Sequence, residues 1–186
     1  MTVNNTIVAL VGMPGSGKTS AADFFQKNGF AVLRFGDQTD IGLKKMGLPI
    51  NEKNEKMYRE KIRKELGMSA MAIKIKPRIN KALKENSKII LDGLYSWEEY
   101  FYLKKTYKNL FLLCIYTQPK KRYLRLSGRK IRGLTEKQAQ ERDYAELEKL
   151  NKGGPIAIAD YLIENNNSKK EFFQKIEKFL NSDIYK

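Results

Sequence analysis

Apolar residues along this chain gather in four runs, at residues 7–11, 31–35, 88–91 and 110–116, and in a shorter fifth run at 161–164. Residues that favour turns bound these runs. Two of them, IVALV and LFLLCIY, show no alternation with polar residues. Such runs are typical of parallel strands that helices cover on both faces. The pattern therefore predicts five parallel strands.

Stretches of helical length separate the predicted strands, and three of them begin with the spacing of a capping box. In this motif a Ser or Thr accepts an early helix N–H, while a Glu or Gln three residues later reaches back to the cap. The three pairs are Ser96 with Glu99, Thr135 with Gln138, and Ser168 with Glu171. In the last helix, apolar residues recur at helical spacing and are expected to pack on the sheet. They are Phe172, Phe173, Ile176, Phe179 and Leu180.

The alternation of strands and helices predicts a doubly wound α/β fold with right-handed crossovers. Two further helices are expected at residues 52–66 and 70–86, inside an insert at about residues 41–87 between the second and third strands. A chain of 186 residues has the size of one domain, and no repeat or linker interrupts it. We therefore expect residues 1–186 to form one α/β domain with a helical insert.

Composition narrows the chemistry that such a domain can perform. The chain has no histidine and one cysteine, Cys114. These counts exclude an internal disulfide, a Ser-His-Asp triad, a Cys-His dyad and a His-ligated metal site. No apolar stretch approaches the length of a membrane helix, and no signal-like segment opens the sequence. We therefore expect a cytoplasmic protein without a membrane partner.

An excess of basic residues indicates anionic partners. Lys and Arg number 36 against 21 Asp and Glu, a formal net charge of +15, which concentrates anions around the protein. Residues 119–132, PKKRYLRLSGRKIR, hold seven basic residues and no acidic one. Such a run is either a solvated face or an anion-binding element, and charge alone leaves both a nucleotide and a nucleic acid open.

A complete phosphate-binding motif follows the first predicted strand. Residues 12–19 read GMPGSGKT and match G-x-x-x-x-G-K-(S/T), with an amphipathic helix directly after them. Backbone N–H groups of such a loop cradle phosphate oxygens, the lysine meets the β- and γ-phosphates, and the Thr hydroxyl ligates Mg²⁺. The residues expected to bind the nucleotide are Gly12, Pro14, Gly15, Ser16, Gly17, Lys18, Thr19 and Ser20. Lys18 is also a catalytic candidate.

The motif alone leaves the fate of the γ-phosphate open, and elimination narrows it. A GTPase is expected to carry N-K-x-D, and neither Asn80-Lys81 nor Asn151-Lys152 is followed by that aspartate. Motor and AAA-type ATPases normally need a larger domain with sensor elements. Kinase chemistry is therefore the leading class.

Two aspartates follow predicted strands, Asp37 in the sequence FGD and Asp92 in the sequence LDG. Open α/β sheets bind ligands at the carboxyl ends of their strands. Asp37 is a catalytic candidate that accepts a hydrogen bond or proton from the attacking hydroxyl, and Asp92 is a candidate to hold a Mg²⁺-bound water. Both, with Gly93, are also candidates to bind the acceptor. The alternatives are a turn or helix cap for Asp37 and an Asp-Gly turn for Asp92.

The basic run also suits a lid at about residues 127–134. Arg122 and Arg125 are expected on a helix starting near Pro119, and Arg129 and Arg132 after it. Arginine binds phosphate bidentately and stabilises a transferring phosphoryl group. Arg129 and Arg132 are therefore catalytic candidates and Arg125 a nucleotide-binding candidate. Arg142, on the next helix, is a weaker candidate for the acceptor, and a solvated face remains the alternative for all of them.

Taken together, these motifs resemble P-loop kinases of the nucleoside monophosphate kinase type, most closely dephospho-CoA kinases and small uncharacterised kinase-like proteins related to them. The motifs are GMPGSGKT, FGD, LDG, the Q-P-x-x-R-x-x-R-x-x-x-R stretch at residues 118–129, and IADYLIENNNSKKEF at residues 158–172. The resemblance covers nearly the whole chain in one order. The insert is its weakest part.

The resemblance implies a three-layer P-loop nucleoside triphosphate hydrolase fold with a parallel sheet in the order 2-3-1-4-5, a substrate-binding insert and an arginine lid. It also implies ATP as the donor, Asp37 as the carboxylate that orients the acceptor, and Asn165 near the adenine pocket. The sequence reads Lys76-Pro77-Arg78 where dephospho-CoA kinases usually carry His-Pro, and FGD replaces an Asp-Ala-Asp-like sequence. These departures weigh against coenzyme A chemistry specifically, and they leave ATP-dependent phosphoryl transfer implied, by a nucleoside or nucleotide kinase or a dephospho-CoA kinase-like enzyme.

The leading hypothesis is an ATP- and Mg²⁺-dependent phosphotransferase that moves the γ-phosphate to a hydroxyl or phosphate of a small, anionic or nucleotide-like acceptor. Two alternatives remain. One is a nucleotide-binding regulator or weak ATPase without a physiological acceptor. The other is a polynucleotide 5′-hydroxyl kinase, which the net charge of +15 suggests.

Overall fold

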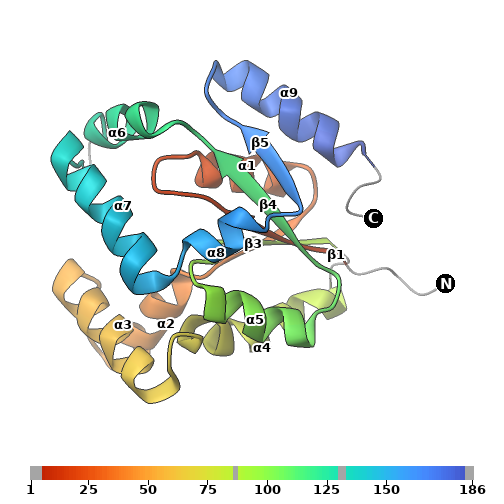
Figure 1. The fold of residues 1–186 in the computed structure, drawn as a ribbon. Helices are drawn as coiled ribbons and strands as arrows, with labels where there is room; N and C mark the ends of the chain where they lie inside the picture. The colour runs from red at the N-terminus through yellow and green to blue at the C-terminus, as the bar shows by residue number, and fades with distance from the viewer. Residues whose placement is uncertain (1–5, 86–87, 130–132, 183–186) are drawn as a thin grey trace.

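A parallel sheet forms the centre of the computed structural model, which describes residues 6–85, 88–129 and 133–182. Its strands run in the order β2-β3-β1-β4-β5 (Figure 1). They are β1 (Thr6–Val11), β2 (Ala31–Arg34), β3 (Lys88–Asp92), β4 (Leu110–Tyr116) and β5 (Tyr161–Glu164). All four pairings are parallel. The predicted strands and their order are confirmed, with three ends shifted by one residue.

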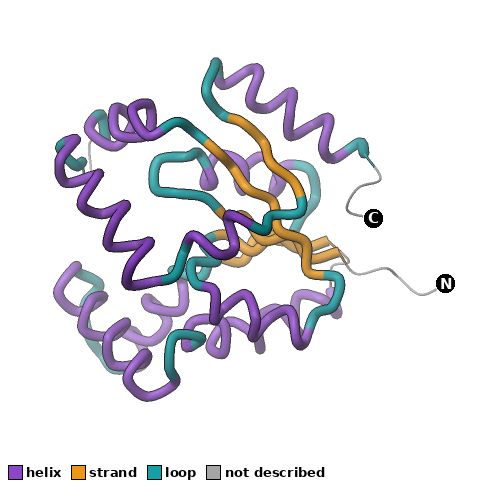
Figure 2. Tube along the Cα trace, in the orientation of Figure 1, coloured by secondary structure: helices purple, strands orange, loops and turns teal. Residues whose placement is uncertain are grey.

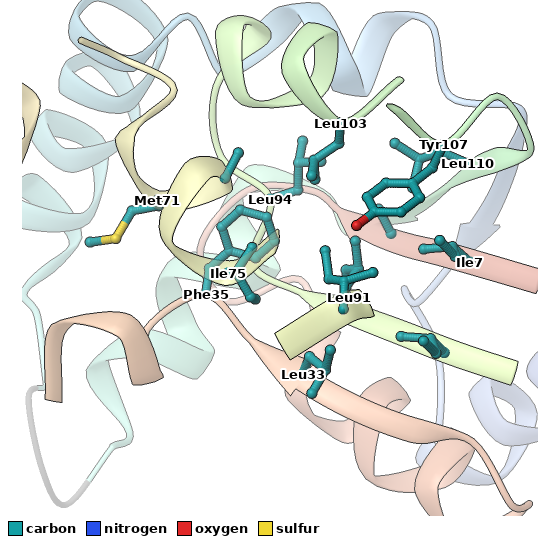
Figure 3. Close-up of a cluster of buried hydrophobic side chains, with 14 of the residues drawn as sticks. Ile7, Leu33, Phe35, Met71, Ile75, Leu91, Leu94, Leu103, Tyr107 and Leu110 are labelled. Atoms are coloured by element: carbon teal, nitrogen blue, oxygen red, sulfur yellow. The ribbon is translucent and has the colours of Figure 1, made fainter. Parts of the chain in front are cut away.

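Helices cover both faces of this sheet, as the unbroken apolar runs predict. In β1, Val8 and Leu10 point into the core beneath α1 (Lys18–Lys27) and α9 (Lys169–Leu180). Their neighbours Ile7 and Ala9 point into the core beneath α4 (Ala70–Glu85) and α5 (Trp97–Thr106). The second core appears in Figure 3, where Leu91 and Ile7 of the sheet lie near side chains of α4 and α5.

The apolar stripe of α9 packs on the sheet as predicted. Phe172, Ile176 and Phe179 are buried, and Phe173 and Leu180 lie partly buried against the same core. Within α9 and its neighbours, Phe24 of α1 stacks on Phe173, with ring centroids 5.0 Å apart. These contacts lock α9 to the P-loop helix.

Three helices fill the segment between β2 and β3: α2 (Asp37–Lys45), α3 (Glu52–Leu66) and α4. The bounds of α3 match the prediction, and α4 ends at Glu85, before the first residue outside the described part of the chain. The sequence analysis did not specify α2. It packs on α3 through Gly42, where a Cβ would lie 2.0 Å from Cζ of Tyr58.

After β4 the chain forms α6 (Pro119–Ser127), α7 (Glu136–Leu150) and the short α8 (Gly153–Ala157) before it returns to β5. Figures 1 and 2 show α6 and α7 beside the edge of the sheet toward which the strands run, with α2 and α3 on the same side. The phosphate-binding loop between β1 and α1 projects toward this edge as well. The carboxyl edge of the sheet is thus enclosed by helices from two separate parts of the chain.

The capping boxes at Ser96 and Thr135 are complete, because both the cap hydroxyl and the later Glu or Gln make their backbone bonds. At Ser168 the hydroxyl accepts from Glu171 N–H and also lies 3.0 Å from the Glu171 carboxylate. Across the described ranges, no helix is both long enough and apolar enough to cross a lipid bilayer.

Candidate functional site

The loop at residues 12–19 has the backbone shape that phosphate binding requires. Gly15 and Gly17 adopt φ angles of 78° and 107°, in the region that side chains rarely enter. Space enforces the same choice, because a Cβ on Gly17 would lie 2.3 Å from Nδ2 of Asn165, and one on Gly15 would lie 2.9 Å from the Arg122 carbonyl oxygen. Two later segments of the chain, at Arg122 and Asn165, therefore pack directly against the loop and leave no space for side chains at these glycines.

Lys18, the first residue of α1, folds back over this loop. Its ammonium donates to the carbonyl oxygens of Gly12, at 2.8 Å, and Met13, at 3.1 Å. Burial and the nearby charge of Lys152 lower the pKa of Lys18 to about 7, although the charge of Asp92 opposes the shift. The hydroxyl oxygen of Ser16 is buried without a hydrogen-bond partner in the described part of the chain. A phosphate group fits here because it supplies acceptors for both donors.

The predicted Mg²⁺ ligands lie on neighbouring elements at the carboxyl edge. Asp92 ends β3 and pairs in register with Leu10 of β1, just before the loop. Its side chain is 13% exposed, and burial raises its pKa despite the charges of Lys18 and Arg34. Thr19 lies in the first turn of α1 with its side chain exposed. These hard oxygen donors fit Mg²⁺, which usually takes one or two protein ligands together with substrate phosphates and waters.

Asp37 is held by a partner from the insert. It is the first residue of α2, and its carboxylate accepts a hydrogen bond from Arg78 of α4 at 3.0 Å. Both side chains are about one-third exposed, at 39% for Asp37 and 33% for Arg78. The sequence analysis noted Arg78 as a departure from the resembled family but assigned it no role. Asp37 is thus the first residue of α2 and not its cap, which is Gly36, and it carries an ion pair with Arg78 that faces solvent.

Arg122 of α6 holds the phosphate loop through a buried hydrogen bond to its backbone. Its guanidinium is buried, binds both carboxylate oxygens of Asp143 at 2.6 and 3.0 Å, and donates to the Pro14 carbonyl oxygen at 3.1 Å. One arginine therefore connects the loop, α6 and α7. Arg122 was predicted on a helix starting near Pro119, and α6 confirms that helix.

Arg125 and Asn165 support the loop from its other side. Arg125 donates to the Asn165 carbonyl oxygen at 2.8 Å, and the Asn165 amide donates to the Ser16 carbonyl oxygen at 2.8 Å. Thr117 bridges the same two carbonyls through its hydroxyl, 3.0 Å from each. These two candidates thus lie at the loop, where most of their polar atoms already contact protein.

The remaining candidates are spread around the edge of the sheet. Arg129 is exposed just after α6, and Arg132 lies outside the described residues, as do Lys130 and Ile131 of the predicted lid. Arg142 is 45% exposed and donates to Glu146 at 2.9 Å. Gly93 is buried, with a φ of 93°.

Sequence reasoning missed a buried pair beside these residues. Lys152 is 2% exposed, forms an ion pair with Glu146, and lies 4.4 Å above the Tyr95 ring. Burial lowers the pKa of Lys152 although Glu146 opposes the shift. In the sequence, Lys152 drew attention only because Asn151-Lys152 matches the first two positions of the guanine-binding motif N-K-x-D without its aspartate. No local pattern identifies it, because its contacts come from Tyr95, which precedes α5, and from Glu146 of α7.

Comparison with known proteins defines the class. A family model described as an AAA domain matches residues 8–149, so the chain belongs to that family. Among solved structures, a shikimate kinase from Bacteroides thetaiotaomicron covers 95% of this chain and 99% of its own, with a TM-score of 0.61 and 13% identity. A gluconokinase from Sinorhizobium meliloti covers 93% and 90%, with a TM-score of 0.55 and 13% identity. The fold is therefore that of P-loop kinases.

Within this class the chain is a member of the UPF0200 proteins. One from Thermococcus kodakarensis is 32% identical over 97% of this chain and 99% of its own length. One from Pyrococcus abyssi is 34% identical over 96% and 97%. These relatives carry the UPF0200 name and not that of dephospho-CoA kinases. The family description also shows that chain length did not exclude an AAA-domain protein.

Proposed function

We propose that this protein transfers the γ-phosphoryl group of ATP to a hydroxyl or phosphate of a small, nucleotide-like acceptor. The observation that carries the proposal is the glycine-built loop with Lys18 folded over it, beside Asp92 and on the same edge of the sheet as Asp37. A kinase-like fold adds support, since phosphoryl transfer demands mainly positioning and charge neutralisation at such an edge.

On the donor side, the loop N–H groups and Lys18 would bind the β- and γ-phosphates. Lys18 would exchange its two carbonyl acceptors for phosphate oxygens, whose negative charge favours the protonated ammonium. Mg²⁺ held by Thr19 and Asp92 would neutralise charge on the triphosphate. Arg122, Arg125 and Asn165 keep the loop in its binding shape.

On the acceptor side, Asp37 would orient the attacking hydroxyl, with Arg78 fixing the carboxylate. The acceptor oxygen forms a bond to the γ-phosphorus as the bond between that phosphorus and the β,γ-bridging oxygen breaks. The electron pair of the broken bond stays on the bridging oxygen and leaves with ADP. The hydroxyl proton passes to Asp37 or to solvent. Arg129, Arg132 and Arg142 supply positive charge toward the transferring group, and Gly93 leaves room at the end of β3.

A regulator or weak ATPase is the second candidate. The observation that favours it is the ion pair of Asp37 with Arg78, because a carboxylate engaged in this way is less available to an acceptor hydroxyl. Water would then be the acceptor, and the products would be ADP and inorganic phosphate. A polynucleotide 5′-hydroxyl kinase is the third, supported by the net charge of +15.

The test is transfer of labelled γ-phosphate from ATP to a set of nucleosides, nucleotides, coenzyme A precursors and short oligonucleotides. Label in a small acceptor supports the proposal. Label only in inorganic phosphate, at a rate that no acceptor changes, supports the weak ATPase. Label in oligonucleotides, with binding that falls steeply as salt rises, supports the polynucleotide kinase. Absence of both ATP binding and turnover contradicts all three.

A further inference from the structure

The turn between α7 and α8 is fixed close to the end of β3. Asn151 ends α7 with a φ of 48°, and its amide donates to the Glu98 carboxylate at the start of α5, at 2.8 Å. Gly154 packs so closely on Trp97 that a Cβ would lie 2.5 Å from the indole ring. These contacts attach the turn to the first residues of α5, the helix that follows β3 in the chain.

This turn carries Lys152, the N-cap residue of α8. Its ammonium is held between the Glu146 carboxylate and the face of the Tyr95 ring. The second carboxylate oxygen of Glu146 accepts from Arg142, whose side chain is 45% exposed. Glu146 thus bridges one cation that is buried and one that reaches solvent.

The electrostatic neighbours of Lys18 include this whole group. The positive charges of Lys152 and Arg142 act to lower the pKa of Lys18, and the negative charges of Asp92 and Glu146 act to raise it. Lys18, Lys152 and Arg142 therefore share an electrostatic environment with the carboxylates of Asp92 and Glu146, and this group carries one positive charge in excess. A buried lysine is costly without an anionic partner, and apolar replacement of a buried pair is often neutral for stability. Packing alone does not require this arrangement.

We propose that Lys152 and Arg142 form a second phosphoryl-binding subsite opposite Lys18, and that Glu146 is the internal anion that occupies it in the free protein. The inference rests on the proposed function. When the ligand arrives, phosphoryl oxygens replace the Glu146 carboxylate as acceptors for both cations, with Arg142 as the exposed point of entry. The phosphoryl group comes either from the γ-position of ATP or from the acceptor.

The test compares the binding of Mg-ATP and Mg-ADP by calorimetry, using the full chain. The variant is the double substitution Lys152→Met with Glu146→Gln, which removes both buried charges and leaves no carboxylate unpaired. Lys149→Met, an exposed lysine in the last turn of α7, is the matched control. If the subsite holds the γ-phosphoryl group, the double variant loses at least tenfold in ATP affinity and keeps its ADP affinity, while the control resembles wild type.

A second experiment tests whether the phosphoryl group in the subsite belongs to the acceptor. Inorganic phosphate is titrated into protein saturated with Mg²⁺ and β,γ-imido-ATP, in which the γ-position is filled. A loss of phosphate binding in the double variant, with ATP affinity unchanged, assigns the subsite to the acceptor. Thermal unfolding of the double variant near the wild-type temperature shows that folding is intact.

A purely structural role for the pair gives a different result. The double variant then keeps both the wild-type preference for ATP over ADP and the wild-type phosphate binding, and this outcome overturns the subsite. Failure of the proposed function is separate, since it appears in the wild-type protein, which then either binds neither nucleotide or transfers no label to a small acceptor. A second double variant, Lys152→Arg with Glu146→Gln, has a cation at position 152. Its affinity should exceed that of the variant with Lys152→Met only if the charge itself binds the phosphoryl group.

Discussion

At the scale of single residues, Lys18 bonds to the loop's own carbonyl oxygens at the place where a phosphate would bind. We predict that Lys18→Ala lowers ATP affinity about 10- to 100-fold, because hydrogen bonds to charged groups contribute about 1.5–3 kcal/mol, and that it abolishes transfer. Calorimetry and the labelled-ATP assay measure the two effects. Lys27→Ala, in the exposed last turn of the same helix, is the control. Unchanged affinity and turnover in Lys18→Ala would refute the assignment of the donor site.

Asp37 gives a second test at this scale. We predict that Asp37→Asn lowers kcat by about 10²- to 10⁴-fold, the usual range for loss of a general base, with little change in ATP affinity. Steady-state kinetics and ATP binding separate the two quantities. Asp40→Asn removes an exposed carboxylate from the same helical turn and should have little effect. A near-normal kcat in Asp37→Asn means that the carboxylate only begins α2 and pairs with Arg78.

At the scale of elements, the capping box of α5 contains a carboxyl group with a strongly raised pKa. Burial raises the pKa of Glu99 to about 7, even though the N–H groups of Tyr95 and Ser96 donate to it. The folded state therefore binds the proton more tightly than the unfolded state, whose pKa is near 4.5. Stability from this group is complete below pH 4.5 and is lost as the pH rises through 7.

We predict that Glu99→Gln raises the free energy of unfolding at pH 8 and leaves it nearly unchanged at pH 4.5. The gain has an upper limit of about 3 kcal/mol, from the pKa difference. Glutamine keeps the acceptor for the box, as Gln138 does in α7. Denaturant unfolding across this pH range measures the change. Glu171→Gln is the control, because the pKa of that exposed group is lowered and its loss should give no gain.

The predicted lid at residues 127–134 is a further element to test. If its arginines close over the phosphates, hydrogen exchange of this segment should slow when Mg²⁺ and a bisubstrate analogue bind. At least one of Arg129→Ala and Arg132→Ala should then lose tenfold or more in kcat, about 1.4 kcal/mol of barrier. A solvated face gives unchanged exchange and near-wild-type rates.

The helices show which elements a sequence can predict. The strands, α3, α7 and α9 follow from apolar periodicity and capping residues. In contrast, α2 has no side-chain cap and contains Gly42, which normally weakens a helix. It forms because that glycine admits the ring of Tyr58. The short α8 contains two glycines and a proline, and its contact with Trp97 stabilises it. Contacts between residues far apart in the sequence produce no periodic or capping pattern within the helix itself, so the sequence did not predict α2 or α8.

At the scale of the whole molecule, the same limit applies to the candidate site. The loop at residues 12–19 was predictable because its spacing is local and its chemistry specific. The partner of Asp37 lies 41 positions away, at Arg78. Lys152 meets Glu146 and Tyr95 only because the turn after α7 packs on the start of α5. Long-range pairs such as these depend on topology, which motif spacing does not encode.

The support of the phosphate loop by Asn165 has a consequence for protein synthesis. The asparagine bonds to Ser16 across 149 positions of sequence, and it follows β5, the last strand to leave the ribosome. A nascent chain that has emerged only as far as α7 already contains every residue of the GMPGSGKT motif but lacks one of the contacts that hold the loop. We therefore expect the loop to bind nucleotide fully only after the fifth strand has joined the sheet. ATP binding by stalled nascent chains would rise abruptly once Asn165 leaves the exit tunnel.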